Sequence, residues 1–373
     1  MNATAFIIER VIIKEIKLDC FRSYKFSEIP INKGINLFYG DNGSGKSSII
    51  ESIYFSLTGK SFRTNDTNNL IQKNKNQTQT LIVFEEGNTI KITKKINNRS
   101  QIAQNRGEKS TNFTKLVKKH PNCLIENKEF FFTTSNPEQK RSFLNKTLFY
   151  VEQTESTLLN EVKKITTQRA GCLKNKDYNQ IKYWDERLIE IEPKIYSLNI
   201  NLCEKINKYL KTSELVKIFE EKNSWIQELS IQYDRGYDSL SSYADILSQN
   251  FEKDCILKRT TEGPHKRSFN IHLNNTDASE TLSRGQQKII SIIFHLIQRE
   301  IIIEHTNLTP ILLMDDISSE LDKENANLML KYLINNSVQT IMTSINFSHF
   351  VDLNDIVLFH VEHNGGCSNV KRL

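Results

Sequence analysis

The feature of this sequence that most limits its fold is a glycine-rich octapeptide near the N-terminus. Residues 40–47 read GDNGSGKS and fit the phosphate-loop pattern G-x-x-x-x-G-K-[ST]. The apolar segment INLFY precedes this loop, and residues 47–57 have the spacing of a helix. A strand, a loop and a helix in this order are the context in which the pattern marks a phosphate site. A plain Gly-rich turn is the alternative, but it would not need Lys and Ser together at the helix start.

The residue types of the loop suit a triphosphate bound with magnesium. Glycines let backbone N–H groups approach phosphate oxygens, and a helix N-terminus adds a favourable dipole. Lys46 can reach the terminal phosphates, and the Ser47 hydroxyl can bind Mg²⁺. We therefore expect ATP and Mg²⁺ as cofactors. The expected binding set in this loop is Gly40, Asn42, Gly43, Gly45, Lys46, Ser47 and Ser48.

A pair of carboxylates follows an apolar segment near the C-terminus. Residues 311–314 read ILLM, which predicts a buried parallel strand, and Asp315 and Asp316 come directly after it. Such a strand would deliver Asp315 to the magnesium shell at its C-terminal edge, where Asp316 could position or activate water. Two adjacent acids can also cap a helix, with residues 318–320 in its first turn. The pair alone leaves both interpretations open.

The catalytic interpretation is favoured by the upstream segment SRGQQK, residues 283–288. Its Ser-x-Gly-Gln element lies at the start of a predicted helix, where it can offer N–H donors to a γ-phosphate. In ABC-type ATPases this element serves the nucleotide of the other subunit. The expected catalytic set is Lys46, Ser283, Asp315 and Asp316, with Asp315 as a Mg²⁺ ligand, and Gly285 and Gln286 join the nucleotide-binding set.

Two more residues join the nucleotide-binding set, each with an alternative. Thr343 follows a predicted strand, where transporter ATPases carry a γ-phosphate-sensing His, although a Thr at a strand end is often purely structural. Arg63, in the segment SFR, could pair bidentately with phosphate oxygens or reach the opposite subunit. An exposed loop arginine without a ligand is the alternative there.

The apolar pattern divides the chain into three segments. Residues 1–135 combine the phosphate loop with β segments, and residues 78–86 and 89–96 alternate around a turn as a β-hairpin does. Residues 136–250 have helical spacing, with helices that look shorter and more interrupted than those of a long coiled coil. Residues 251–373 return to alternating helices and strands. We expect an α/β fold, an ABC-type ATPase head (P-loop NTPase) with an antiparallel β-lobe and an inserted helical lobe.

Composition adds limits on partners and location. Lys and Arg total 50 against 44 Asp and Glu in 373 residues, and the net charge of +6 permits a polyanionic partner without requiring one. The six Cys include no C-x-x-C pair, which argues against a zinc site and a disulfide framework. No window approaches about 18 uninterrupted apolar residues, and the N-terminus has no small-residue cleavage site. We expect a cytoplasmic protein that has no membrane partner.

Scattered basic residues could form a surface that binds the DNA backbone through counterion release. Solvated helix faces are the alternative for each of them. These residues are Lys115, Lys118, Lys119, Lys163, Lys164, Arg169 and Lys174.

The motifs recur in the order found in RecF, the family of bacterial DNA gap-repair proteins with an ABC-type head. CFRSYKF and GDNGSGKSSIIESIYFSLTGKSFRT resemble its N-terminal region, and residues 136–145 resemble its Pro-x-x-Arg-Arg-x-Phe-Leu-Asp segment. LSRGQQK is similar to its signature loop, and LLMDDISSELD to its magnesium strand and D-loop. Matches in between are Gln168-Arg169, Leu173-Lys174, Trp184-Asp185 and residues 262–265. The resemblance covers nearly the whole chain.

The resemblance implies a head that binds ATP and forms an ATP-dependent homodimer, with each nucleotide between the phosphate loop of one subunit and the Ser283–Gly285 element of the other. Weak, DNA-stimulated hydrolysis would then dissolve the dimer. It further implies binding to DNA at single-strand gaps and single-strand/double-strand junctions. The function would be recombinational repair of gaps and stalled forks, with RecO and RecR as partners in loading RecA.

Several positions depart from the family pattern. Lys266, Arg267 and Ser268 stand where the family has Arg-Asp-Asp. Lys140 replaces an Arg and Asn145 an Asp, and Asn325 stands where a base is expected. Two alternatives stay open: an ATPase of a mobile-element or anti-phage defence system, and a nucleotide-gated DNA clamp that hardly hydrolyses ATP.

Overall fold

The computed structural model describes residues 8–105, 108–110, 112–126, 137–152, 154–238, 240–316, 321–345 and 355–373. The chain forms two units. The first comprises Met1–Lys128 with Gln298–Leu373, and the second comprises Glu129–Ile297. The second unit thus runs past residue 250, where the sequence pattern suggested a return to the head. The boundary falls inside the long helix α10 (Arg284–Thr306), which is continuous across it.

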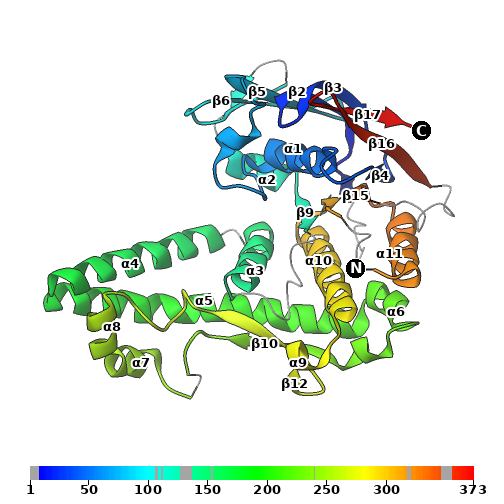
Figure 1. The fold of residues 1–373 in the computed structure, drawn as a ribbon. Coiled ribbons are helices and arrows are strands. Elements are labelled where there is room, and N and C mark those ends of the chain that lie inside the picture. Colours follow the sequence, from blue (N-terminus) through cyan, green and yellow to red (C-terminus); the bar gives the residue numbers. More distant parts are fainter. Residues whose placement is uncertain are drawn as a thin grey trace, which may run out of the picture. The chain divides into compact units, whose positions relative to one another are not determined.

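The first unit contains a mostly parallel six-stranded sheet with the order β17-β16-β4-β15-β14-β9 (Figure 1). Its inner strands are almost entirely buried, as expected of parallel strands that are covered on both faces. Only the outermost pair, β16 and β17, is antiparallel. The strands are β4 (Ile35–Tyr39), β9 (Asn122–Ile125), β14 (Ile311–Met314), β15 (Thr340–Ser344), β16 (Ile356–Asn364) and β17 (Cys367–Arg372).

A second six-stranded sheet of the first unit is antiparallel, with the order β3-β2-β5-β6-β7-β8. Buried and partly exposed residues alternate along β5, so one face packs on the core. The pairing of β5 with β6 confirms the predicted hairpin. The strands are β2 (Ile13–Phe21), β3 (Tyr24–Pro30), β5 (Gln77–Phe84), β6 (Thr89–Lys95), β7 (Gln101–Gln104) and β8 (Glu108–Ser110).

Helix α1 (Lys46–Thr58) lies between these two sheets (Figure 1). Its isoleucines at 49, 50 and 53 join one core cluster with residues of both sheets, and a helix covered all round needs little polar surface. The helix ends at Gly59, whose φ of 72° and contact with Phe113 exclude a side chain. The unit also contains β1 (Glu9–Arg10), η1 (Thr67–Leu70), α2 (Phe113–Lys119), β13 (Leu308–Thr309) and α11 (Lys323–Asn335).

The second unit is mostly helical and is built on a helical hairpin. Its helices α4 (Glu155–Asn175) and α5 (Tyr178–Thr212) are joined by two residues and lie side by side (Figure 1). A small antiparallel sheet, β10-β11-β12, packs beside α5. The remaining elements are α3 (Pro137–Val151), α6 (Glu214–Glu220), η2 (Ser224–Glu228), β10 (Leu229–Asp234), α7 (Tyr243–Gln249), α8 (Phe251–Leu257), β11 (Ser268–Leu273), β12 (Thr276–Asp277) and α9 (Ala278–Thr281).

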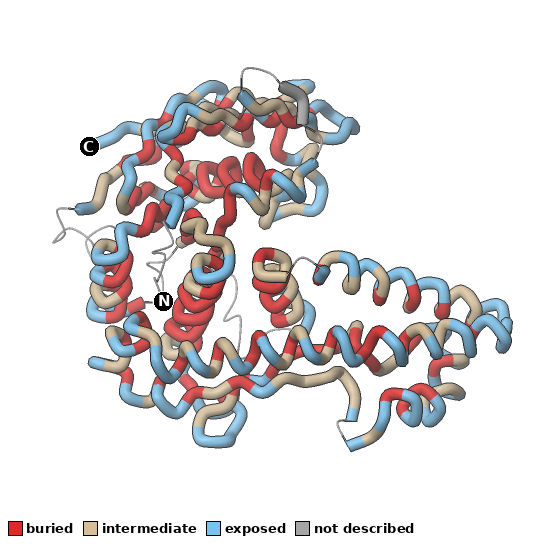
Figure 2. Tube along the Cα trace, turned by 180° about the vertical axis from the view of Figure 1, so that it is seen from behind, coloured by how far each residue is buried: buried red, intermediate tan, exposed pale blue. Residues whose placement is uncertain are grey.

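The longest helix of this unit is α5, which runs for 35 residues and contains Pro193. Its buried apolar residues at 181, 188, 191, 195, 202 and 206 are separated by three, four or seven positions, which keeps one face apolar throughout. Figure 2 shows buried positions recurring along this helix. Continuous packing on that face maintains the helix past the proline, which lacks an N–H and crowds the carbonyl of the preceding turn.

One buried ion cluster joins three helices of the second unit. The Arg169 side chain of α4 is fully buried and contacts Asp185 of α5 and Asp254 of α8, each at 2.5 Å, as well as Thr260. Its place among the candidate DNA-contacting residues was therefore wrong, because DNA cannot reach a guanidinium inside the unit. In the part of the chain that the structure describes, no helix is long and apolar enough to cross a bilayer.

Candidate functional site

The phosphate loop links the end of β4 to the start of α1, as predicted. Gly40, Gly43 and Gly45 have φ values of 151°, 81° and 111°, which side chains rarely adopt. A Cβ at Gly40 would lie 2.2 Å from the Val361 carbonyl oxygen, and a Cβ at Gly45 would lie 2.5 Å from the Ser368 hydroxyl. Gly43 has open space around it, so its requirement is conformational. The glycine spacing therefore reflects the geometry of the loop.

Lys46 bends back over this loop. Its ammonium donates hydrogen bonds to the carbonyl oxygens of Gly40 and Asp41, at 2.6 and 2.8 Å. Burial lowers the pKa of Lys46, and the carboxylates of Asp316, Asp315 and Asp41 oppose this shift. The loop, its lysine and the acidic pair thus share one electrostatic environment.

The acidic pair follows β14, and Thr343 lies on the neighbouring strand β15, which pairs with β14 in parallel. The Thr343 hydroxyl donates to a carboxylate oxygen of Asp315 at 2.7 Å and accepts from the backbone N–H of Asp316 at 2.8 Å. Asp316 has a φ of 51°, so this hydrogen bond holds an uncommon backbone conformation. Thr343 is itself fully buried and organises the acidic pair.

The helix-cap alternative for the acidic pair finds no support in α11. That helix begins at Lys323, and the Asp322 side chain caps it by accepting from the N–H of Asn325 at 2.9 Å. Residues 317–320, which include the first two residues of the expected D-loop, 319–322, lie outside the described residues. The helix-cap alternative, which placed residues 318–320 in the first turn, therefore stays open. What connects the acidic pair with the phosphate loop is the effect of its carboxylates on the pKa of Lys46.

The oxygen donors near the loop fit a hard cation. Ser47, in the first turn of α1, and Asp315 offer a hydroxyl and a carboxylate, which are ligand types that Mg²⁺ accepts. Over the described ranges no group of three or more His, Cys, Asp or Glu forms a metal cage. This donor set matches Mg²⁺, which usually binds through one or two protein oxygens together with phosphate and water.

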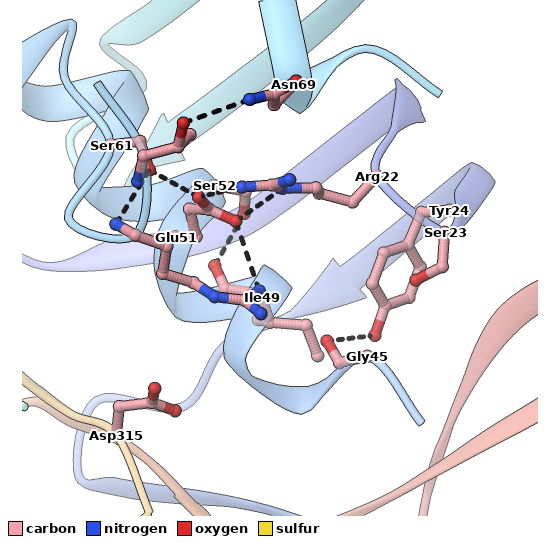
Figure 3. A network of polar contacts seen from close by, with 12 residues as sticks. Arg22, Ser23, Tyr24, Gly45, Ile49, Glu51, Ser52, Ser61, Asn69 and Asp315 are labelled. Carbon is pink, nitrogen blue, oxygen red and sulfur yellow. Dashed lines mark hydrogen bonds and ion pairs between the residues drawn. The ribbon is translucent and has the colours of Figure 1, made fainter. Parts of the chain in front are cut away.

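Arg63 does not stand alone in its loop. Its guanidinium lies 3.5 Å from the carboxylate of Glu51. Glu51 is a fully buried residue of α1 and is labelled in Figure 3. Arg22 binds the same carboxylate with two hydrogen bonds of 2.9 and 2.7 Å, and the Ser61 hydroxyl adds a third at 2.5 Å. Arg63 remains 40% exposed. Sequence reasoning missed Glu51, although an acid inside the apolar run IIESIYF is an available signal.

The signature element begins α10, as predicted. The Ser283 hydroxyl accepts from the N–H of Gln286 at 3.3 Å, and the Gln286 side chain accepts from the N–H of Ser283 at 2.9 Å. This reciprocal pair is a capping box, which fixes the first turn of the helix. Gly285 has open space where a side chain would begin. These three residues belong to the second unit, whereas the loop, the acidic pair, Thr343 and Arg63 belong to the first.

Comparisons with known proteins agree with this arrangement. The RecF/RecN/SMC N terminal domain model matches residues 12–368. The DNA replication and repair protein RecF of Aliivibrio fischeri is 30% identical over 366 residues, which is 95% of this chain and 98% of that protein. The protein of the same name from Shewanella halifaxensis is 28% identical, covering 96% and 98%.

Solved structures show the same fold. A structure of the recombination mediator protein RecF with ATPrS has a TM-score of 0.82 at 23% identity and covers 99% of this chain and 100% of that one. An Smc head bound to the C-terminal winged-helix domain of ScpA has a TM-score of 0.57 at 18% identity, covering 97% of both chains. The predicted α/β ATPase-head fold, with its antiparallel β-lobe and inserted helical lobe, is thereby confirmed, and the chain belongs to the RecF family.

Proposed function

We propose that this chain is an ATP-dependent DNA-binding protein of recombinational repair, acting in the cytoplasm at single-strand gaps and stalled forks. The observation that carries the proposal is the pairing of a phosphate loop, over which Lys46 is held, with an acidic pair fixed by Thr343 on the adjacent strand. A nucleotide-dependent switch requires these groups. Relatives of this chain are named DNA replication and repair proteins.

In this proposal the backbone N–H groups of residues 40–48 hold the ATP phosphates and Lys46 neutralises their charge. Ser47 and Asp315 hold Mg²⁺, which when bound offsets the charge on the β- and γ-phosphates. Asp316 orients the attacking water. Its backbone amide is already fixed by Thr343, so the carboxylate is attached to a rigid support.

The second half of the switch lies in the signature element of another copy of the chain. Ser283, Gly285 and Gln286 of one subunit contact the γ-phosphate held by its partner, so that ATP favours a homodimer and slow hydrolysis releases it. The capping box supports this role because it fixes the N–H groups at the start of α10. The dimer binds gapped DNA and works with RecR and RecO in loading RecA.

Sedimentation with a gapped DNA duplex tests the proposal, with no nucleotide, ADP or ATP present. The wild-type chain should dimerise and retain DNA only with ATP. Lys46→Ala should abolish both effects, and Asp316→Asn should preserve them while turnover is lost. ATP binding without a dimer or a DNA complex would refute the repair function. Equal turnover in wild type and Asp316→Asn would refute the role of Asp316, and a rate near zero in both would favour a clamp that hardly hydrolyses ATP.

A further inference from the structure

We propose that Tyr24 and Ser368 are positioning residues of the phosphate loop, whose hydroxyls lie behind it and direct its backbone N–H groups towards a bound phosphate. The inference rests on the proposed ATP-binding function and adds to it two side chains from distant parts of the sequence. Neither residue belongs to the phosphate-loop motif.

Tyr24 opens strand β3, and its ring is fully buried. The Tyr24 hydroxyl donates to the carbonyl oxygen of Gly45 at 3.1 Å, a contact that Figure 3 shows. Gly45 is the N-cap residue of α1 and has no side chain that could cap the helix. The Gly45 carbonyl also accepts from the N–H of Ser48 in the first turn at 3.0 Å, so the Tyr24 hydroxyl adds a second donor, from outside the helix, to a residue with a φ of 111°.

Ser368 lies on β17 and is almost fully buried. It contacts the carbonyl of Ser44, the residue before Gly45 in the phosphate loop. Its hydroxyl donates to the carbonyl oxygen of Ser44 at 2.5 Å. The backbone N–H of Ser368 donates to the Ser23 carbonyl at 2.9 Å, which fixes the position of the side chain. Two consecutive carbonyls of the phosphate loop thus each receive a hydroxyl donor from the same side of the site.

Two further polar groups lie within hydrogen-bonding distance of the Ser368 hydroxyl. The Ser23 hydroxyl lies 2.7 Å from it, and Nδ1 of His363 lies 3.2 Å from it. A carbonyl oxygen can only accept, so the single Ser368 proton is used on Ser44, and the Ser23 hydroxyl and His363 Nδ1 act as donors. This assigns the Nδ1 proton of His363 and completes the hydrogen bonding of the Ser368 oxygen.

The geometry of the peptide group connects these carbonyls to phosphate binding. A trans peptide is planar, and its C=O and N–H point in opposite directions. The Ser44 carbonyl shares a peptide group with the Gly45 N–H, and the Gly45 carbonyl shares one with the Lys46 N–H. Hydroxyls that hold both carbonyls behind the loop therefore direct both N–H groups to its other side, as an anion-binding loop requires. Preorganised donors bind an anion without a further cost of ordering.

The test compares Tyr24→Phe and Ser368→Ala with wild type in two measurements, the Kd for Mg²⁺-ATP and the melting temperature. Each variant should raise the Kd roughly threefold to tenfold, the effect of one hydrogen bond. The matched control is Tyr332→Phe, which removes a buried hydroxyl of the same unit that donates to Glu300 at 2.5 Å, on helices α11 and α10. This control should leave the Kd unchanged whatever its effect on melting.

The outcomes separate the inference from the proposed function. Wild-type binding with an unchanged Kd in both loop variants would refute the positioning role alone. An equal rise in Kd for Tyr332→Phe would show that general destabilisation, and not loop geometry, controls affinity, and would also refute it. Wild-type protein that binds ATP no better than Lys46→Ala would refute the proposed function, and the positioning role with it.

Discussion

Glu51 is a single buried carboxylate that serves two arginines. Its side chain has no exposed surface, whereas the side chains of Arg22 and Arg63 are 23% and 40% exposed. A buried carboxylate persists only when it is paired and hydrogen-bonded, and both arginines and Ser61 supply those partners. Glu51 thereby ties the turn before β3 and the loop after α1 to the helix that carries Lys46.

Glu51→Gln should destabilise the first unit by about 2–3 kcal/mol, near the lower end of the cost of breaking a buried ion pair, because the arginines keep partial access to water. Urea unfolding, followed by circular dichroism, measures this loss. The matched control is Glu28→Gln, which breaks the exposed pair with Lys17 and should leave the unfolding midpoint unchanged. A Glu51→Gln variant as stable as wild type would show that the cluster contributes no net stability.

At this scale, sequence reasoning located the residues whose roles depend on local spacing. Lys46 and Ser47 follow from one continuous motif, and Asp315 follows from the strand before it. Tyr24 and Ser368 could not be predicted, because Ser368 contacts Ser44 across 324 positions and no local pattern records that pairing. Thr343 was found from its strand-end position, but its hydrogen bonds to the acidic pair became visible only with the register of β14 and β15.

Among the elements of the second unit, the three helices α4, α5 and α8 are joined by Arg169. Its two carboxylate partners, Asp185 and Asp254, come from different helices, so removing the guanidinium leaves two acids facing each other inside the unit. Burial raises the pKa of Asp185, and Arg169 opposes this shift. Without Arg169 the pKa of Asp185 should therefore rise further.

Arg169→Met should lower the free energy of unfolding by about 3–5 kcal/mol at pH 8, because it leaves buried charge unpaired. The penalty should shrink at pH 5. In the variant the pKa of the folded Asp185 lies above that of the unfolded chain, so the folded state binds more protons in that window, and acidification restores stability. Urea unfolding at both pH values measures the effect.

Arg187→Met provides the matched control for this prediction. It removes the same side chain from α5 of the same unit but breaks only exposed pairs with Glu161 and Glu190, so its unfolding midpoint should stay close to that of wild type. A penalty for Arg169→Met that is the same at pH 5 and pH 8 would contradict the buried-charge explanation.

Sequence patterns predicted elements well where the period is short and uninterrupted. The β5–β6 hairpin is an example, because strict alternation on both sides of a tight turn leaves few other arrangements. The length of α5 does not follow from local propensity, because Pro193 lies inside the helix. Its apolar face is maintained by packing against α4 and the elements around it, which is a tertiary effect that local propensity does not include.

Across the whole molecule, buried histidines link stability to pH in both units. Burial lowers the pKa of His120 in the first unit to about 4, and it lowers those of His265 and His295 in the second unit to about 4. Their ordinary value is 6.5, so between pH 6.5 and 4 the unfolded chain binds more protons than the folded one. The folded state therefore loses stability as the pH falls through this window.

The units can be followed separately because both tryptophans, Trp184 and Trp225, lie in the second one. Urea unfolding detected by tryptophan fluorescence should show a midpoint that falls between pH 7 and pH 5, with each histidine contributing at most about 1.4 kcal/mol per pH unit. His295→Leu should flatten this dependence. His120→Phe keeps an aromatic ring against Phe84, stacked at 4.4 Å in the wild type, and should leave the fluorescence-detected dependence unchanged.

Circular dichroism, which reports on both units, should reveal the reduced acid sensitivity of the first unit in His120→Phe. If burial of these rings is the cause, fluorescence should therefore detect the effect of His295→Leu alone, whereas circular dichroism should detect the effects of both variants. The acid-induced loss of stability, followed by fluorescence, could also persist unchanged in His295→Leu. That result would show that groups other than His295 cause the pH dependence of the second unit.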